Sequence, residues 1–184
     1  MQIWRRSVCA LLGLVLFAAA DVADAQTAAP GGYSETLSWY HDRSQAGDPR
    51  AQFLLAIKYE TGTDVPKNLQ KARELYVRAA RQGHADAQFR AGTLAQANGG
   101  TEAQLKVAQD WYRAAALQGH VPAQYNLAVT LAMHAREEDQ FTEAASWAIR
   151  AAEGGLKQAR ALQAGLLDRL PQPAADEARL SVVI

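Results

Sequence analysis

Four glycines divide the chain at a constant interval of 36 residues: Gly47, Gly83, Gly119 and Gly155. The sequence around them repeats as well, because AARQGHADAQF at residues 79–89 returns as AALQGHVPAQY at residues 115–125 and as AAEGGLKQARA at residues 151–161. A fixed period in this range is the signature of a solenoid, whose stacked units share one continuous core. The sequence therefore predicts a repeat architecture over most of the chain.

Each unit has the pattern of helix, loop and helix. In the first unit, Asp48 is a suitable N-cap before a proline at the first helical position, and apolar residues then recur at helical spacing. The stretch GTDVP at residues 62–66 interrupts that pattern, and a second apolar stripe ends at Gly83. We therefore expect an all-α fold, an α-solenoid of antiparallel helix pairs.

The period also sets the expected boundaries. A solenoid over residues 33–170 would begin with an N-terminal half-repeat at residues 33–46, followed by units that start near residues 47, 83 and 119. We expect helices at residues 49–61, 67–82, 85–97, 102–118, 121–135, 139–153 and 156–170. The last of these would close the array without a second helix. Beyond it, residues 171–184 form a C-terminal tail, a short helix or an extended segment, whose apolar residues 182–184 could dock on the last helix.

The N-terminus has the pattern of an export signal. Residues 1–25 contain a positive region at Arg5 and Arg6, an apolar run at residues 8–19 and an A-x-A site that predicts cleavage after Ala25. The apolar run is too short for a stable membrane span. A general secretory signal fits better than a twin-arginine signal, because the twin-arginine pattern is incomplete. The expected product is an exported, periplasmic or secreted protein with a disordered leader at residues 26–32.

Charge and cysteine content exclude several classes of function. The 19 basic and 19 acidic residues balance, so there is no overall field to attract nucleic acid. The one cysteine, Cys9, lies within the predicted signal. A mature chain would therefore have no cysteine for catalysis or for a thiolate metal site.

Residues 51–88 resemble the Sel-one-like repeat (SLR), a relative of the tetratricopeptide repeat. The positions that carry the resemblance are Ala51, Leu55 with Ala56, Tyr59, Gly62 with Val65, Lys71 with Ala72, Leu75 with Tyr76, and Ala79 with Ala80 and Gly83. The chain departs from the family pattern at Asp64, which replaces a loop glycine, and at Ala95 and Leu131, which replace the tyrosine. The resemblance implies an α-solenoid that serves as an adaptor or scaffold for other proteins, often in bacterial envelopes.

Candidate chemical sites have simpler structural explanations. His84 and His120 occupy equivalent positions, but equivalent places in stacked helix pairs lie about 10 Å apart, too far to share one zinc ion. The acidic run from Glu137 to Glu143 coincides with a predicted helix start, where acids favour the helix dipole. We therefore expect no catalytic residues, no metal site and no cofactor.

Two alternatives to a scaffold stay open at this point. One is a cell-wall or β-lactam-related hydrolase or binding protein on the same scaffold, although the chain lacks the cysteine pairs that mark the β-lactam-linked branch of the family. The other is a module that binds a glycan or a small molecule. Solenoid grooves are open, however, and seldom provide the enclosed polar pocket that such a ligand needs.

The first helices of the units are predicted to line a concave groove that binds a protein or peptide of the cell envelope. The predicted groove residues are Gln52, Phe53, Gln88, Phe89, Arg90, Gln124, Tyr125 and Asn126. The aromatic members of this set fit packing between units as well as they fit the groove. We expect the protein to be a monomer.

Overall fold

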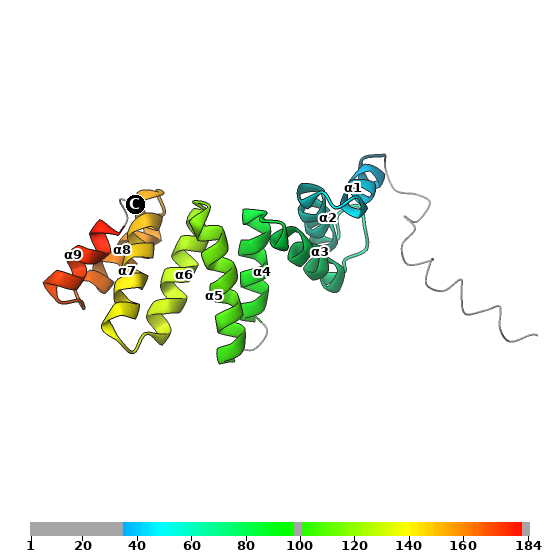
Figure 1. Ribbon diagram of the computed structural model, residues 1–184. Coiled ribbons are helices and arrows are strands. Elements are labelled where there is room, and N and C mark those ends of the chain that lie inside the picture. The colour runs from blue at the N-terminus through cyan, green and yellow to red at the C-terminus, as the bar shows by residue number, and fades with distance from the viewer. Residues whose placement is uncertain (1–34, 98–100, 182–184) are drawn as a thin grey trace, which may run out of the picture.

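The computed structural model describes residues 35–97 and 101–181, which form nine α-helices (Figure 1). The helices are α1 (Glu35–Gln45), α2 (Pro49–Thr61), α3 (Leu69–Arg81), α4 (Ala85–Ala97), α5 (Glu102–Leu117), α6 (Val121–His134), α7 (Glu138–Glu153), α8 (Lys157–Leu167) and α9 (Gln172–Leu180). Of the seven helices with predicted bounds, α2 and α4 have those bounds, and the other five differ by one to three residues at one or both ends. The predicted signal and leader lie outside the described residues.

The helices stack in chain order into an elongated array, with α1 at one end and α9 at the other (Figure 1). From α1 to α8, each helix packs mainly against its sequence neighbours. Thus α2 with α3, α4 with α5, and α6 with α7 form the helix pairs of the three units. Helix α1 takes the place of a second helix whose first helix is absent from the described residues, which is the predicted half-repeat.

Alanines let the helices approach closely. The second helices bury alanines at equivalent positions: Ala72, Ala79 and Ala80 in α3, Ala108, Ala115 and Ala116 in α5, and Ala144, Ala151 and Ala152 in α7. The large rings of Tyr76 and Tyr112 are completely buried among them. At Gly92, an added Cβ would lie 2.7 Å from the Tyr112 ring. Small residues opposite large ones therefore produce the dense packing that stacked units require.

The first loop places Asp64 in a left-handed conformation at the position of a family glycine. Gly62 ends α2 with φ +78°, and Asp64 has φ +63°, a left-handed conformation that aspartate tolerates better than most residues. The Asp64 carboxylate lies 2.6 Å from the Lys58 ammonium, and Val65 is buried in the core. The ion pair with Lys58 and the burial of Val65 therefore anchor this turn.

The C-terminal end of the array differs from the prediction of a closing helix without a partner. After Pro171 the chain reverses, and α9 packs on α7 through Ala174, Ala175 and Ala178. The guanidinium of Arg150 donates a hydrogen bond of 2.5 Å to the Ser181 carbonyl. Small side chains on one face of α9 allow this close contact, so α9 replaces a full second helix. The predicted docking of residues 182–184 lies outside the described residues.

Candidate partner-binding surface

The three predicted groove glutamines are buried side chains. Each side-chain amide donates to the backbone carbonyl eight residues earlier, across the turn between two units: Gln52 to Ser44 at 3.1 Å, Gln88 to Ala80 at 3.2 Å, and Gln124 to Ala116 at 3.2 Å. All three residues are at most 7% exposed. Their predicted placement on an open groove is therefore wrong, because their amides turn inward and add a second hydrogen bond to carbonyls that also accept from the backbone of the following turn glycine.

A second glutamine completes this arrangement in two of the three cases. The Gln82 amide donates to Gln52 Oε1 at 2.8 Å, and the Gln118 amide donates to Gln88 Oε1 at 2.7 Å. We call each such glutamine pair, together with its carbonyl, an amide clamp. The third clamp is incomplete because Gly154 stands where the second glutamine would be. Gln124 Oε1 is accordingly buried without a hydrogen-bond partner.

The aromatic residues of the predicted groove pack between units. The Phe53 ring lies 4.7 Å from the His84 ring, and the Phe89 ring lies 4.8 Å from the His120 ring. Tyr125 packs against the alanine cluster formed by α7 and α8. All three aromatic residues are half-buried. Of the two alternatives that the sequence left open, the structure favours packing.

The two equivalent histidines cap helices. The His84 Nδ1 atom accepts a hydrogen bond from the Ala87 backbone at 3.4 Å, and the His120 Nδ1 atom accepts one from Ala123 at 3.1 Å. The Asp86 carboxylate lies 3.3 Å from His120 Nε2. Within residues 35–97 and 101–181, no group of three or more His, Cys, Asp or Glu side chains is placed to hold a metal ion. Both imidazoles thus serve the start of a first helix.

A buried tyrosine in each of the first two units is paired with a polar side chain of the first helix. The Tyr76 hydroxyl donates to Glu60 at 2.6 Å, and the Tyr112 hydroxyl donates to Gln96 at 3.0 Å. Burial and the Glu60 carboxylate raise the pKa of Tyr76 far above its ordinary value. Arg90 lies 3.9 Å from Glu60. These contacts join the two helices of a unit to each other and to the next unit.

The acidic run from Glu137 to Glu143 forms a helix start and an interhelical contact. Helix α7 begins with Glu138 and Asp139, as the dipole argument predicts. Glu143 accepts from Arg113 at 2.6 Å and from the Trp147 indole at 3.2 Å, so it joins α7 to α5. These acids do not converge on a common pocket.

Among the accessible positions of the first helices, which also include Arg50 and Asp86, one repeat position holds Leu54, Arg90 and Asn126. Leu54 is 39% exposed, the Arg90 side chain is 45% exposed, and Asn126 is half-buried. We call these three residues the variable row, because the side chain changes from apolar to cationic to amide while the flanking glutamine and aromatic positions recur. Only Arg90 and Asn126 of the predicted groove residues belong to it.

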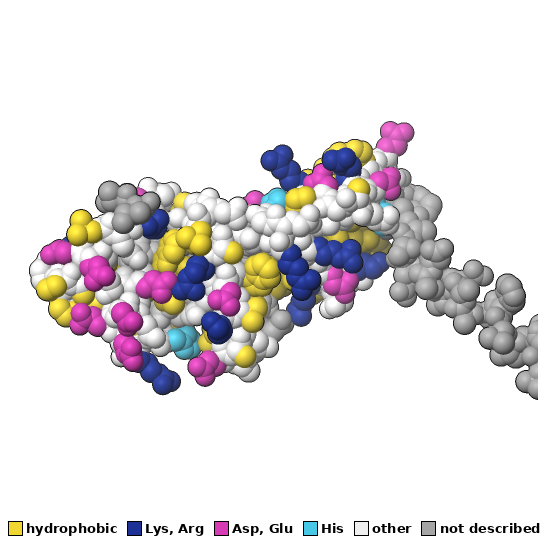
Figure 2. All heavy atoms as spheres, viewed as in Figure 1, with side chains coloured by type: hydrophobic (Ala, Val, Ile, Leu, Met, Phe, Trp, Pro, Cys, Tyr) yellow, Lys and Arg dark blue, Asp and Glu magenta, His cyan; other side chains and the backbone are white. Residues whose placement is uncertain are grey.

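The surface as a whole has no dominant charge. Figure 2 shows acidic and basic side chains interspersed along the visible face of the array. Across the part of the chain that the structure describes, every helix is too short or too polar to cross a bilayer. The surface therefore favours recognition by local shape and side-chain chemistry over recognition by a strong electrostatic field.

Stacked antiparallel helix pairs with a 36-residue period define an α-solenoid repeat protein. The Sel1 repeat model matches three consecutive segments, residues 49–84, 85–120 and 121–156, which together make up more than half of the chain. The chain belongs to the Sel1 repeat family. Proteins of this family generally act as protein–protein interaction scaffolds and are typically not catalytic.

Two solved structures show the same fold. One is a protective antigen of uropathogenic Escherichia coli strains with an SLR fold, at 30% identity and a TM-score of 0.62 over 78% of this chain. The other is a Sel1 repeat protein from Oxalobacter formigenes, at 28% identity and a TM-score of 0.65, also over 78% of this chain. The matches cover 31% and 63% of those two chains, respectively. No curated protein matches the sequence. These comparisons do not favour the hydrolase alternative.

Proposed function

We propose that this protein is an exported scaffold that binds a protein or peptide of the cell envelope through its variable row. The observation that carries the proposal is a difference between two kinds of position on the first helices. The glutamines and aromatic residues of the first helices are used in packing, whereas Arg90 and Asn126 differ between units and retain accessible surface. Interaction surfaces need side chains that are free to differ, and arginine is enriched where binding energy concentrates.

Site-specific photo-cross-linking in the native cell tests this surface. A photoreactive amino acid at position 90 or 126 is expected to give a discrete cross-linked partner. The same amino acid at position 106 is the control, because Lys106 lies on a second helix and its side chain is 78% exposed. Equal cross-linking from position 106, or none from positions 90 and 126, would contradict the assignment.

Charge reversal at Arg90 tests whether this residue contributes to the binding energy or only lies near the partner. The Arg90→Glu variant is expected to weaken capture of the cross-linked partner at least tenfold, because a hot-spot arginine is worth about 2 kcal/mol or more. Arg160→Glu, on α8 and outside the variable row, is the matched control. Since Arg90 also faces Glu60, the thermal midpoint of each variant must be measured alongside the capture.

Export is tested separately. The pattern of residues 1–25 supports cleavage after Ala25. Mass spectrometry of the protein recovered from the periplasmic fraction or the medium should therefore find a mature N-terminus at Gln26. An intact Met1 in the cytoplasmic fraction would contradict export and would leave the scaffold assignment in place.

A further inference from the structure

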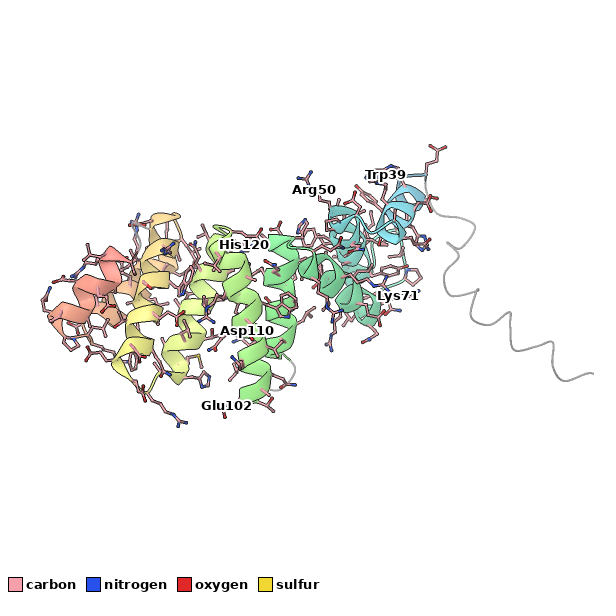
Figure 3. All side chains as sticks on the ribbon, in the orientation of Figure 1. Trp39, Arg50, Lys71, Glu102, Asp110 and His120 are labelled. Atoms are coloured by element: carbon pink, nitrogen blue, oxygen red, sulfur yellow. The ribbon has the colours of Figure 1, made fainter. Side chains whose placement is uncertain are left out.

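A hollow of about 320 Å³ lies between α1 and α2 at the N-terminal end of the array. Its lining is largely apolar and comprises Tyr40, Leu54, Ile57, Lys58, Thr61 and Thr63. Trp39, which Figure 3 labels on α1 at this end, is 54% exposed. Aromatic and branched apolar side chains are therefore accessible together at one place.

The repeat shows what packs at this position in the other units. Tyr40 lies one period before Tyr76 and two periods before Tyr112, and both of those rings are completely buried. In each case the first helix of the same unit covers the ring, and its Glu60 or Gln96 side chain accepts the tyrosine hydroxyl. In the described part of the chain, Tyr40 has no such helix over it.

The helices that cover Tyr76 and Tyr112, α2 and α4, share a short sequence pattern. In α2, the buried Ala56 precedes the acceptor Glu60 by four residues. In α4, Gly92 precedes the acceptor Gln96 by four residues, and any side chain at Gly92 would meet the Tyr112 ring. A small residue therefore admits the ring, and one turn later a polar side chain accepts its hydroxyl.

The α2 side of the hollow also corresponds to positions that contact a preceding first helix one unit later. Leu54 and Lys58 of α2 correspond to Arg90 and Leu94 of α4. Arg90 reaches back to the preceding first helix at Glu60, and Leu94 packs against the core cluster around α2 and α3. Tyr40, Leu54 and Lys58 of the lining thus occupy positions whose equivalents one unit later, Tyr76, Arg90 and Leu94, contact α2 or the core cluster around it.

We propose that this hollow is the docking site for an amphipathic α-helix of another protein, which takes the place of a first helix before α1. The docked helix would place Ala or Gly against the Tyr40 ring and would accept the Tyr40 hydroxyl four residues later. Either glutamate or glutamine can be that acceptor, as Glu60 and Gln96 are in the next two units. Recognition of a helix through spaced anchors is an established mode of peptide binding.

A peptide of the α4 sequence, residues 85–97, provides a probe that carries this pattern. Added to the full ¹⁵N-labelled chain, it is expected to give saturable shifts of the Trp39 indole signal. A peptide with Gly92→Leu and Gln96→Leu is expected to give none. If neither peptide binds up to millimolar concentration, or if both bind equally, the proposal is overturned.

Substitutions in the chain test the contacts directly. Tyr40→Phe is expected to weaken binding of the α4 peptide about threefold to tenfold, the usual worth of one hydrogen bond. The effect should vanish with the peptide that lacks Gln96, because the hydrogen bond is then already lost. Leu117→Ser, at an exposed position on α5, is the control. Equal binding by the wild type and Tyr40→Phe would overturn the hydroxyl contact.

Two other occupants are distinguishable outcomes. Phe17, Ala20 and Asp24 lie one period before Phe53, Ala56 and Glu60. If the uncleaved chain, which retains residues 1–25, binds the peptide only after Phe17→Ser and Asp24→Ser are introduced, the chain's own segment is the occupant and the proposal fails. It also fails if peptide binding is lost as dimers form at rising protein concentration, since a second copy would then fill the hollow. Either result leaves the variable row, tested at Arg90 and Asn126, unaffected.

Discussion

At the scale of a single residue, Gln88 is a polar side chain that is buried in the core. Its amide donates to Ala80, and its carbonyl oxygen accepts from Gln118, so both polar ends are satisfied in a buried position. A buried polar group that is fully hydrogen-bonded costs little, whereas one that loses a partner is strongly unfavourable. The amide clamps therefore hold consecutive units in one register.

Removing the glutamine that donates in a clamp should destabilise the fold more than is usual for an exposed side chain. Gln118 is exposed, yet Gln118→Ala leaves Gln88 Oε1 buried without a partner. We expect a loss of about 1 to 3 kcal/mol in the free energy of unfolding. Chemical denaturation followed by circular dichroism measures it. Gln70→Ala on the exposed face of α3 is the control, and an equal loss there would refute the clamp.

Completing the third clamp requires two changes. At Gly154, an added Cβ would clash with the Val121 side chain, so Gly154→Gln alone is expected to destabilise the fold. Combined with Val121→Ala, the new glutamine can donate to Gln124 Oε1, which has no partner in the native chain. This double variant should be about 1 kcal/mol more stable than Gly154→Met with Val121→Ala, which relieves the same clash but cannot donate a hydrogen bond. Equal stability of the two double variants would argue against the clamp.

The ionisation of Asp48 should make the stability of the first unit depend on pH. The pKa of Asp48 is held below its ordinary value of 3.8, chiefly by the hydrogen bond from the Ala51 backbone at the start of α2. The stabilisation by its carboxylate is therefore present above pH 3.8 and is lost as pH falls through the lowered pKa. Thermal midpoints of wild type and Asp48→Ala should differ at pH 7 and converge in stronger acid. A constant difference down to pH 2.5 would contradict this role.

At the scale of the element, α9 shows how a short helix can close an array. It packs on α7 through alanines, and Arg150 is bonded to the backbone just after α9 ends. This arrangement leaves the first helix of the last pair, α8, with only slight contact to α9. A solenoid needs its terminal unit covered, and here a nine-residue helix supplies the cover.

A charge introduced on the packed face of α9 should detach this helix. Ala178 is completely buried, so Ala178→Glu forces a carboxylate into the contact with α7. Hydrogen exchange in α9 is expected to accelerate at least tenfold, while exchange in α3 and α4 stays unchanged. Glu177→Ala, at an exposed position on the same helix, is the control. Unchanged exchange in α9 would show that the contact contributes little.

At the scale of the whole molecule, contacts between neighbouring helices hold the array together. Each helix from α1 to α8 packs mainly on its sequence neighbours, so stability is expected to be a sum of unit and interface contributions. The third unit and its interface with α8 lack several polar contacts that the first two units have. Leu156 stands where His84 and His120 cap first helices, and Ala132 and Ala148 stand where the tyrosine pairs lie. The units are thus alike in fold but not in their interfaces.

The independence of the interfaces can be measured. Gln82→Ala and Gln118→Ala each break a different clamp. Because the two clamps share no partner, the free-energy losses of the two variants should add within about 0.5 kcal/mol. Denaturant titrations of both single variants and the double variant test this. A larger coupling would show that the clamps act as one network.

Much of the fold could be predicted because its evidence is local and repeated. The spacing of Gly83 and Gly119, the alanine positions and the cap at Asp48 each report on backbone geometry within one unit. The groove residues could not be predicted as well, because Gln88 and Arg90 lie two positions apart on one helix and both are polar.

The sequence by itself determined the period, the helix pairs and the family of this protein. These follow from hydrophobic spacing and turn residues, which act over a few positions and recur three times. The tertiary structure decided which polar side chains are free. Gln88 is buried because the Ala80 carbonyl and the Gln118 amide meet it across a turn, whereas Arg90 faces outward between two first helices. The repeat period locates both residues, but their exposure depends on atoms that only packing brings together.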